Sequence, residues 1–146
     1  MKVKLSSIIN SRDWLGLWGL TPERANLGGE GKGVKNLLLT PMPAATSIRL
    51  MRVVRTCALE SEAYEKTRFA LLERCGEKGE EDKITKMSLY SFPDADKRAE
   101  FVKEYNELME SEVEIPLDAP LPATALQVAV GDILPLLAQE LEWLFA

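Results

Sequence analysis

The stretch from Ala44 to Cys75 constrains the fold more than any other part of this chain. It contains no glycine and no proline, and good helix formers run through it. Pro43 suits the first turn of a helix, and Gly76 suits the position after its last turn. A helix of about 30 residues is about 45 Å long at 1.5 Å per residue. We therefore predict that this helix is the spine of the fold.

The apolar residues of this stretch recur at spacings of three and four, which is typical of one helix face. The predicted apolar face consists of Ile48, Met51, Val54, Cys57, Ala58, Tyr64, Leu71 and Leu72. Such a helix places Cys57 and Cys75 about 27 Å apart, whereas a disulfide needs Cα atoms within about 7 Å. We expect free thiols, as in a reducing compartment.

A second helix and several short strands follow from local signals. Pro93 and Asp94 open a predicted helix that runs to about Ser111, with Asp94 or Asp96 as its N-cap. Polar and apolar residues alternate in the segments 2–5 and 112–117, which predicts two short strands. If these strands pair, Lys2 and Lys4 would face Glu112 and Glu114. We expect residues 76–83 to form a polar turn and residues 84–92 to favour a β conformation.

Together these elements predict a predominantly helical α+β fold in a single domain, residues 1–146. A long antiparallel helix pair would be flanked by a small sheet of two or three short strands. A C-terminal helix from about Asp132 would close one end. Residues 12–38 contain Trp14, Trp18 and the glycine run Gly28–Gly33, and they predict a loop-rich insertion.

Composition argues against most enzymatic chemistry. The chain of 146 residues has no histidine, which removes the commonest general base, imidazole-based triads and His-ligated zinc sites. Two cysteines cannot by themselves form a structural zinc site. Gly31-Lys32 resembles part of a phosphate-binding loop, but Asn26 stands where its first glycine belongs and Gly33 where Ser or Thr should hold Mg²⁺. We predict a protein that is not an enzyme and has no cofactor and no metal site.

The apolar runs of the chain and its first residues indicate where in the cell we expect the protein. No apolar run approaches the roughly 18 to 20 residues that span a bilayer. The first five residues are too polar for a secretory signal. We therefore expect an intracellular protein without a membrane partner.

Charge is distributed unevenly along the chain. Residues 1–58 hold nine Lys/Arg and three Asp/Glu, which gives +6, whereas the whole chain carries −5. Arg49, Arg52 and Arg55 lie three apart on the predicted long helix and could follow a phosphate backbone. The segment 104–118 is acidic and has no Lys or Arg, so antiparallel packing of the two helices would offer an internal partner. We favour internal pairing over nucleic acid, which the low isoelectric point of about 4.9 also disfavours.

Aromatic residues give further candidates for contact with a partner. Trp14 and Trp18 would share one face of a helical turn and could form either a small core or a recognition patch. The terminal Trp143-Leu144-Phe145 could complete the core or form a homodimer, which we expect from the apolar character of the last helix. The candidate partner-binding residues are Trp14, Trp18, Arg49, Arg52, Arg55, Trp143 and Phe145.

The order of these segments resembles a known family. The resemblance covers roughly residues 44–118, and its motifs are Phe69-Ala70-Leu71-Leu72-Glu73-Arg74-Cys75-Gly76-Glu77-Lys78 and Phe101-x3-Tyr105-Asn106-Glu107-Leu108-Met109-x2-Glu112-Val113-Glu114-Ile115. The chain is similar there to small uncharacterised helical proteins of tailed bacteriophages and prophages. The segment 12–38 departs from that pattern, and the family offers no site residues to carry over.

The resemblance implies a viral origin and an accessory role in the host cytoplasm. We expect a protein that binds a host or phage protein, and inhibition of a host defence system is one such role. The alternatives are a virion structural or assembly component and a protein that sequesters a nucleotide.

Overall fold

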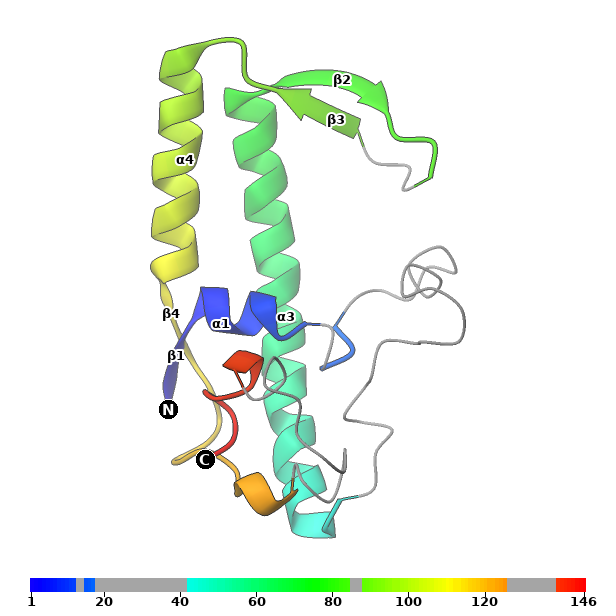
Figure 1. The fold of residues 1–146 in the computed structure, drawn as a ribbon, viewed down its shortest axis with the longest axis vertical. Helices are drawn as coiled ribbons and strands as arrows, with labels where there is room; N and C mark the ends of the chain where they lie inside the picture. The colour runs from blue at the N-terminus through cyan, green and yellow to red at the C-terminus, as the bar shows by residue number, and fades with distance from the viewer. Residues whose placement is uncertain (13–14, 18–41, 85–87, 126–138) are drawn as a thin grey trace.

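The computed structural model describes residues 1–12, 15–17, 42–84, 88–125 and 139–146, and its longest element is a single helix (Figure 1). The elements are β1 (Lys2–Lys4), α1 (Leu5–Asn10), α3 (Ala44–Cys75), β2 (Glu77–Glu81), β3 (Ser88–Ser91), α4 (Ala95–Glu110) and β4 (Glu112–Glu114). This arrangement confirms the predicted fold class, predominantly helical α+β.

Helix α3 has the bounds that its sequence predicts. It begins after Pro43, and the N–H of Gly76 closes it by donating to the Leu72 carbonyl at 2.8 Å. A Cβ at Gly76 would lie 2.9 Å from that carbonyl oxygen, which is closer than side chains tolerate. Glycine is therefore required where the chain leaves α3.

Helix α4 packs antiparallel to the C-terminal half of α3 (Figure 1), so the predicted helix pair is confirmed. Asp94 caps α4, because its carboxylate accepts hydrogen bonds from the backbone N–H groups of Asp96 and Lys97. The hydroxyls of Tyr64 and Tyr105 lie 3.0 Å apart and join the two helices. Since α4 has 16 residues and α3 has 32, half of α3 extends beyond this pairing.

The two strands predicted at the segments 2–5 and 112–117 are present and pair with each other, an arrangement that the sequence left open. β1 and β4 are antiparallel, and Val3 lies opposite Val113 with both side chains buried. Charges reinforce the pairing: Lys2 contacts Glu112 at 3.4 Å, and the N-terminal amino group contacts Glu114 at 3.0 Å.

The prediction of a polar turn after α3 is wrong. Residues Glu77–Glu81 form strand β2, which pairs antiparallel with β3 and makes a second, separate two-stranded sheet. All five residues of β2 are exposed, so the segment lacks the alternation that indicates a half-buried strand. Phe92 packs on Phe101 of α4 with ring centroids 4.8 Å apart, which anchors the hairpin at its base.

The hydrophobic core lies around the N-terminal half of α3, where α1, β4 and the C-terminal residues meet. Its fully buried members include Ile8, Leu50, Val53, Cys57, Ile115, Leu121, Leu141 and Leu144. The predicted apolar face of α3 is partly wrong, because Ile48 is 57% exposed and Met51 is 41% exposed. Apolar residues occur on two faces of this half of the helix, and spacing alone does not distinguish the buried face.

The end of the chain belongs to this core. Gln139 and Glu140 are helical and a turn follows them, while the predicted start of the last helix at Asp132 lies outside the described residues. Leu121 and Phe145 form a parallel bridge, in which the N–H of Leu121 donates to the Leu144 carbonyl at 2.7 Å and the Leu121 carbonyl accepts from the N–H of Ala146 at 2.8 Å. Trp14, Trp18 and Gly28–Gly33 also lie outside the described residues.

Candidate functional site

The outward face of the N-terminal half of α3 carries an exposed mixture of basic and apolar side chains. At 100° per residue this face lies opposite the buried one, which is formed by Leu50, Val53, Val54 and Cys57. We call it the arginine stripe, and it consists of Ile48, Met51, Arg52, Arg55 and Leu59. Leu59 is 69% exposed, the highest value of the three apolar side chains. Arg49 is exposed at the edge of the stripe.

The electrostatic setting of the stripe is unusual for the start of a helix. No acidic residue occurs between positions 44 and 59, although the partial positive charge of a helix N-terminus favours acids there. No ion pair links Arg49, Arg52 or Arg55 to another described residue. The positive charge of this surface is therefore not neutralised by the described part of the fold.

The prediction that these arginines pair with residues 104–118 is wrong for the described structure. Glu104 instead forms an ion pair with Arg74, near the other end of α3. Glu110, at the end of α4, forms one with Lys4 of β1. The cause is the length and register of α4, which covers only the C-terminal half of α3.

The aromatic candidates differ in burial where the structure describes them. Phe145 is 6% exposed and belongs to the core, so of its two predicted roles the structure supports completion of the core. Trp143 is half-buried, and its Nε1–H donates to Ser11 Oγ at 2.8 Å. Trp14 and Trp18 remain predictions, since they lie outside the described residues.

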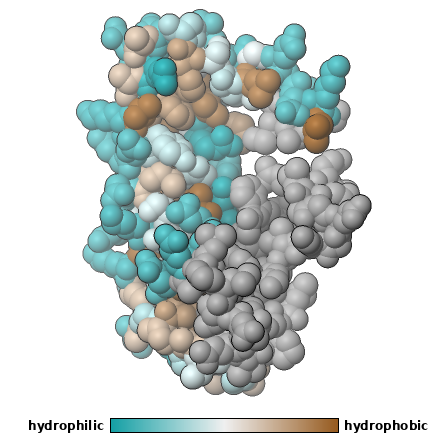
Figure 2. All heavy atoms as spheres, in the orientation of Figure 1, coloured by the Kyte–Doolittle hydropathy of each residue, from teal (hydrophilic) through white to brown (hydrophobic). Residues whose placement is uncertain are grey.

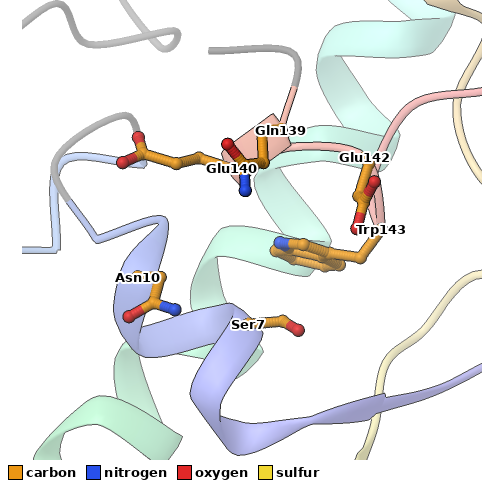
Figure 3. Close-up of a pocket in the computed structure, with 6 residues that line it drawn as sticks. All are labelled: Ser7, Asn10, Gln139, Glu140, Glu142 and Trp143. Atoms are coloured by element: carbon orange, nitrogen blue, oxygen red, sulfur yellow. The ribbon is translucent and has the colours of Figure 1, made fainter. Parts of the chain in front are cut away.

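A hollow of about 390 Å³ lies between α1 and the C-terminal turn (Figure 3). Its lining residues are Ser7, Asn10, Gln139, Glu140, Glu142 and Trp143. The indole of Trp143 forms one wall, and the other lining side chains are polar. No histidine, lysine or cysteine is among the residues that line this hollow.

The described cysteine thiols are structural. Cys57 is fully buried, and burial followed by the nearby Glu60 carboxylate raises the pKa of its thiol to about 12. Cys75 is 2% exposed and also free. A thiol that stays protonated and inaccessible is a poor nucleophile and a poor metal ligand.

A partly buried charge network at the centre of α3 was not among the predicted features. Arg12 donates to Glu65 at 2.7 Å, and Arg68 donates to the other carboxylate oxygen of Glu65 at 2.8 Å. Burial alone would raise the pKa of Glu65, but the hydrogen bonds from the two arginines outweigh it and lower the pKa. No local signal could reveal this pair, because 53 positions separate Arg12 from Glu65.

Comparisons with known proteins give no family and no function for this chain. No protein-family model, curated protein or solved structure matches the chain. Within the described ranges, His, Cys, Asp and Glu side chains form no group of three or more that could hold a metal ion. No helix among the described residues is long and apolar enough to span a membrane. The arginine stripe is the feature that the fold itself leaves unexplained.

Proposed function

We propose that this chain is a non-enzymatic accessory protein that binds another protein through the arginine stripe of α3. The observation that carries the proposal is the exposure of two arginines and three large apolar side chains on one face of a rigid helix. The resemblance over residues 44–118 supports a phage or prophage origin. The partner would then be a host or phage protein in the host cytoplasm, and a host defence protein is a fitting target.

The chemistry of the stripe favours a protein partner over nucleic acid. Ile48, Met51 and Leu59 alternate with the arginines along the face, and apolar side chains gain nothing from a phosphate backbone. A protein surface with acidic residues around an apolar centre would match both kinds of side chain. Arginine is also enriched at the energetically important positions of protein interfaces.

Stability of the chain does not account for the stripe. Exposed apolar side chains contribute little to folding, and cations early in a helix oppose its dipole. The described residues provide no acid to offset the charge of Arg52 and Arg55. Binding to a partner would explain why exposed arginines and apolar side chains occur together on the arginine stripe.

Site-specific photocrosslinking in the bacterial host tests the proposal. A photoreactive amino acid at Leu59, on the stripe, should form a discrete adduct with one heterologous protein. The same amino acid at Val102 is a matched control, because Val102 is 47% exposed on α4, away from the stripe. Arg52→Glu with Arg55→Glu should abolish the Leu59 adduct without changing expression.

Other outcomes would overturn the proposal and favour a different class. An adduct that forms equally from Val102, or that survives both arginine reversals, would exclude the stripe as the binding surface. Stoichiometric protein in purified phage particles would assign the chain to the virion. A nucleotide released on denaturation of the purified protein would favour nucleotide sequestration. Salt-sensitive binding to random-sequence duplex DNA would favour nucleic acid as the partner of the stripe.

A further inference from the structure

The exposed apolar side chains of the described structure gather on two surfaces of opposite charge. The seven large apolar residues that are most exposed are Ile48, Met51, Leu59, Phe69, Ile84, Leu89 and Val102. Four of them lie on the outward face of α3 and two belong to the β2–β3 hairpin or the turn that joins its strands. Only Val102 lies elsewhere among the described residues. The concentration of apolar area on α3 and the hairpin indicates contact surfaces.

The β2–β3 hairpin has the charge that the arginine stripe lacks. Glu77, Glu80 and Glu81 are exposed on β2, where they outnumber the single lysine, Lys78, and no ion pair joins them to another described residue. Ile84 is 70% exposed and Leu89 is 56% exposed beside them. Figure 2 shows brown, hydrophobic side chains among teal ones over this hairpin. The hairpin therefore has the acidic and apolar chemistry that the stripe requires of a partner.

The two surfaces lie on the same side of the molecule. The hairpin leaves the end of α3 on the side away from α4 (Figure 1). The outward face of α3 points in that direction too, because α4 contacts the opposite face through Tyr64. Arg55 lies 20 residues before Cys75, the last residue of α3, which is about 30 Å along the helix. The hairpin of one molecule is therefore too far along α3 to cover its own stripe.

We infer that a second copy of this chain covers the stripe, in a two-fold dimer with antiparallel α3 helices. The hairpin of each protomer would lie on the arginine stripe of its partner, so both contacts form at once. A two-fold interface is self-complementary by construction, and here it closes both surfaces without leading to filaments. The dimer builds on the proposed function, since it would cover the same stripe until a heterologous partner displaces the second copy.

The middle of the outward face is compatible with this arrangement. A two-fold axis midway between stripe and hairpin passes near position 66. Glu62 and Lys66 lie there and form an ion pair of 2.8 Å within one helix, so the centre carries no net charge to repel a second copy. Phe69, which is 38% exposed, adds apolar area next to them.

Charge-swap complementation tests the dimer directly. One variant carries Arg52→Glu and Arg55→Glu on the stripe, and the other carries Glu80→Arg and Glu81→Arg on the hairpin. In each variant alone, both contacts would bring like charges together, and the dissociation constant of the dimer should rise at least about tenfold. In an equimolar mixture both contacts would join opposite charges again, so a heterodimer should form. Sedimentation equilibrium with one variant labelled measures all three cases.

A charge exchange on a surface outside the proposed dimer interface serves as the control. A variant with Lys103→Glu and Glu107→Lys on the exposed side of α4 should dimerise like the wild type. Wild-type protein that stays monomeric at about 100 μM in low salt would overturn the inference, as would variants that dimerise alone or a mixture that stays monomeric. Far-UV circular dichroism checks that each variant is folded.

A second measurement does not depend on charge reversal. In purified protein, a photoreactive amino acid at Leu59 should form adducts with residues 77–91 of another copy. Mixed isotopic labelling shows that the adduct joins two molecules, and an adduct elsewhere would contradict the proposed geometry. These experiments contain no heterologous protein, so their failure would leave the proposed function untouched.

Discussion

Arg12 donates a hydrogen bond of 2.7 Å from its Nη1 to Oε1 of Glu65, and this contact ties the end of α1 to the middle of α3. The Arg12 side chain is 11% exposed, its Nε–H donates to the Ile9 carbonyl, and its guanidinium lies 5.4 Å from the ring centroid of Tyr64. Loss of the guanidinium would leave a partly buried carboxylate with fewer donors. We therefore expect this contact to matter for folding.

The first prediction concerns Arg12 itself. Arg12→Met should lower the free energy of unfolding by about 2 kcal/mol, since it removes a charge-assisted hydrogen bond and keeps the apolar stem. Urea denaturation measures the change. Lys2→Met is the matched control: it breaks an exposed pair with Glu112 between β1 and β4 and should have little effect. Equal effects of the two substitutions would contradict a special role for Arg12.

The second prediction is a pH dependence carried by Glu65. Its pKa in the folded protein is lowered below the ordinary value of 4.5, so the stabilisation is present above that value and is lost as the pH falls through the folded pKa. Unfolding free energies measured from about pH 6 to pH 3 should fall more steeply for the wild type than for Glu65→Gln. Parallel curves for the two proteins would show that Glu65 does not contribute to acid sensitivity.

The third prediction concerns the hydrogen bond between Tyr64 and Tyr105. Burial, followed by this hydrogen bond, raises the pKa of Tyr64 above the ordinary value for tyrosine. Tyr64→Phe and Tyr105→Phe should each destabilise the protein by about 1 kcal/mol. The double variant should be less destabilised than the sum, because the second substitution removes a bond that is already lost. Additive effects would mean that the two hydroxyls act independently.

The fourth prediction follows from the buried thiols. Iodoacetamide at about pH 8 should label neither Cys57 nor Cys75 in the folded protein, since burial keeps both inaccessible and raises the pKa of Cys57 to about 12. Both should react after denaturation, and mass spectrometry counts the adducts. Rapid labelling of native Cys57 would show that the core opens near the middle of α3.

The fifth prediction separates binding from stability on the arginine stripe. Arg52→Glu should change the free energy of unfolding by less than about 0.5 kcal/mol, because Arg52 is exposed and has no ion pair with a described residue. An accompanying Glu107→Arg should restore nothing, since the α4 register does not bring Glu107 to Arg52. Rescue of a destabilised Arg52→Glu by Glu107→Arg would instead support the internal pairing that the sequence suggested.

Local chemistry was sufficient to predict several elements of this fold. Pro43 and Gly76 bound α3, and Asp94 caps α4, because helix ends depend on the few residues that satisfy their own backbone groups. The alternation of polar and apolar residues predicted β1 and β4, and their opposite charges are consistent with the pairing that the structure shows across more than 100 positions. Charge and spacing in these two short segments therefore indicated the strands and their complementarity.

Only the tertiary structure decided which face of α3 is buried and what lies beside each half. Apolar residues occupy both sides of its N-terminal half, so the choice of Leu50 over Met51 depends on distant segments that pack there. The register of α4 directs Glu104 to Arg74 and leaves Arg52 exposed, although the sequence suggested the opposite pairing. Helix boundaries arise from neighbours in the chain, whereas register and the choice of face arise from the fit of side chains that are far apart in it.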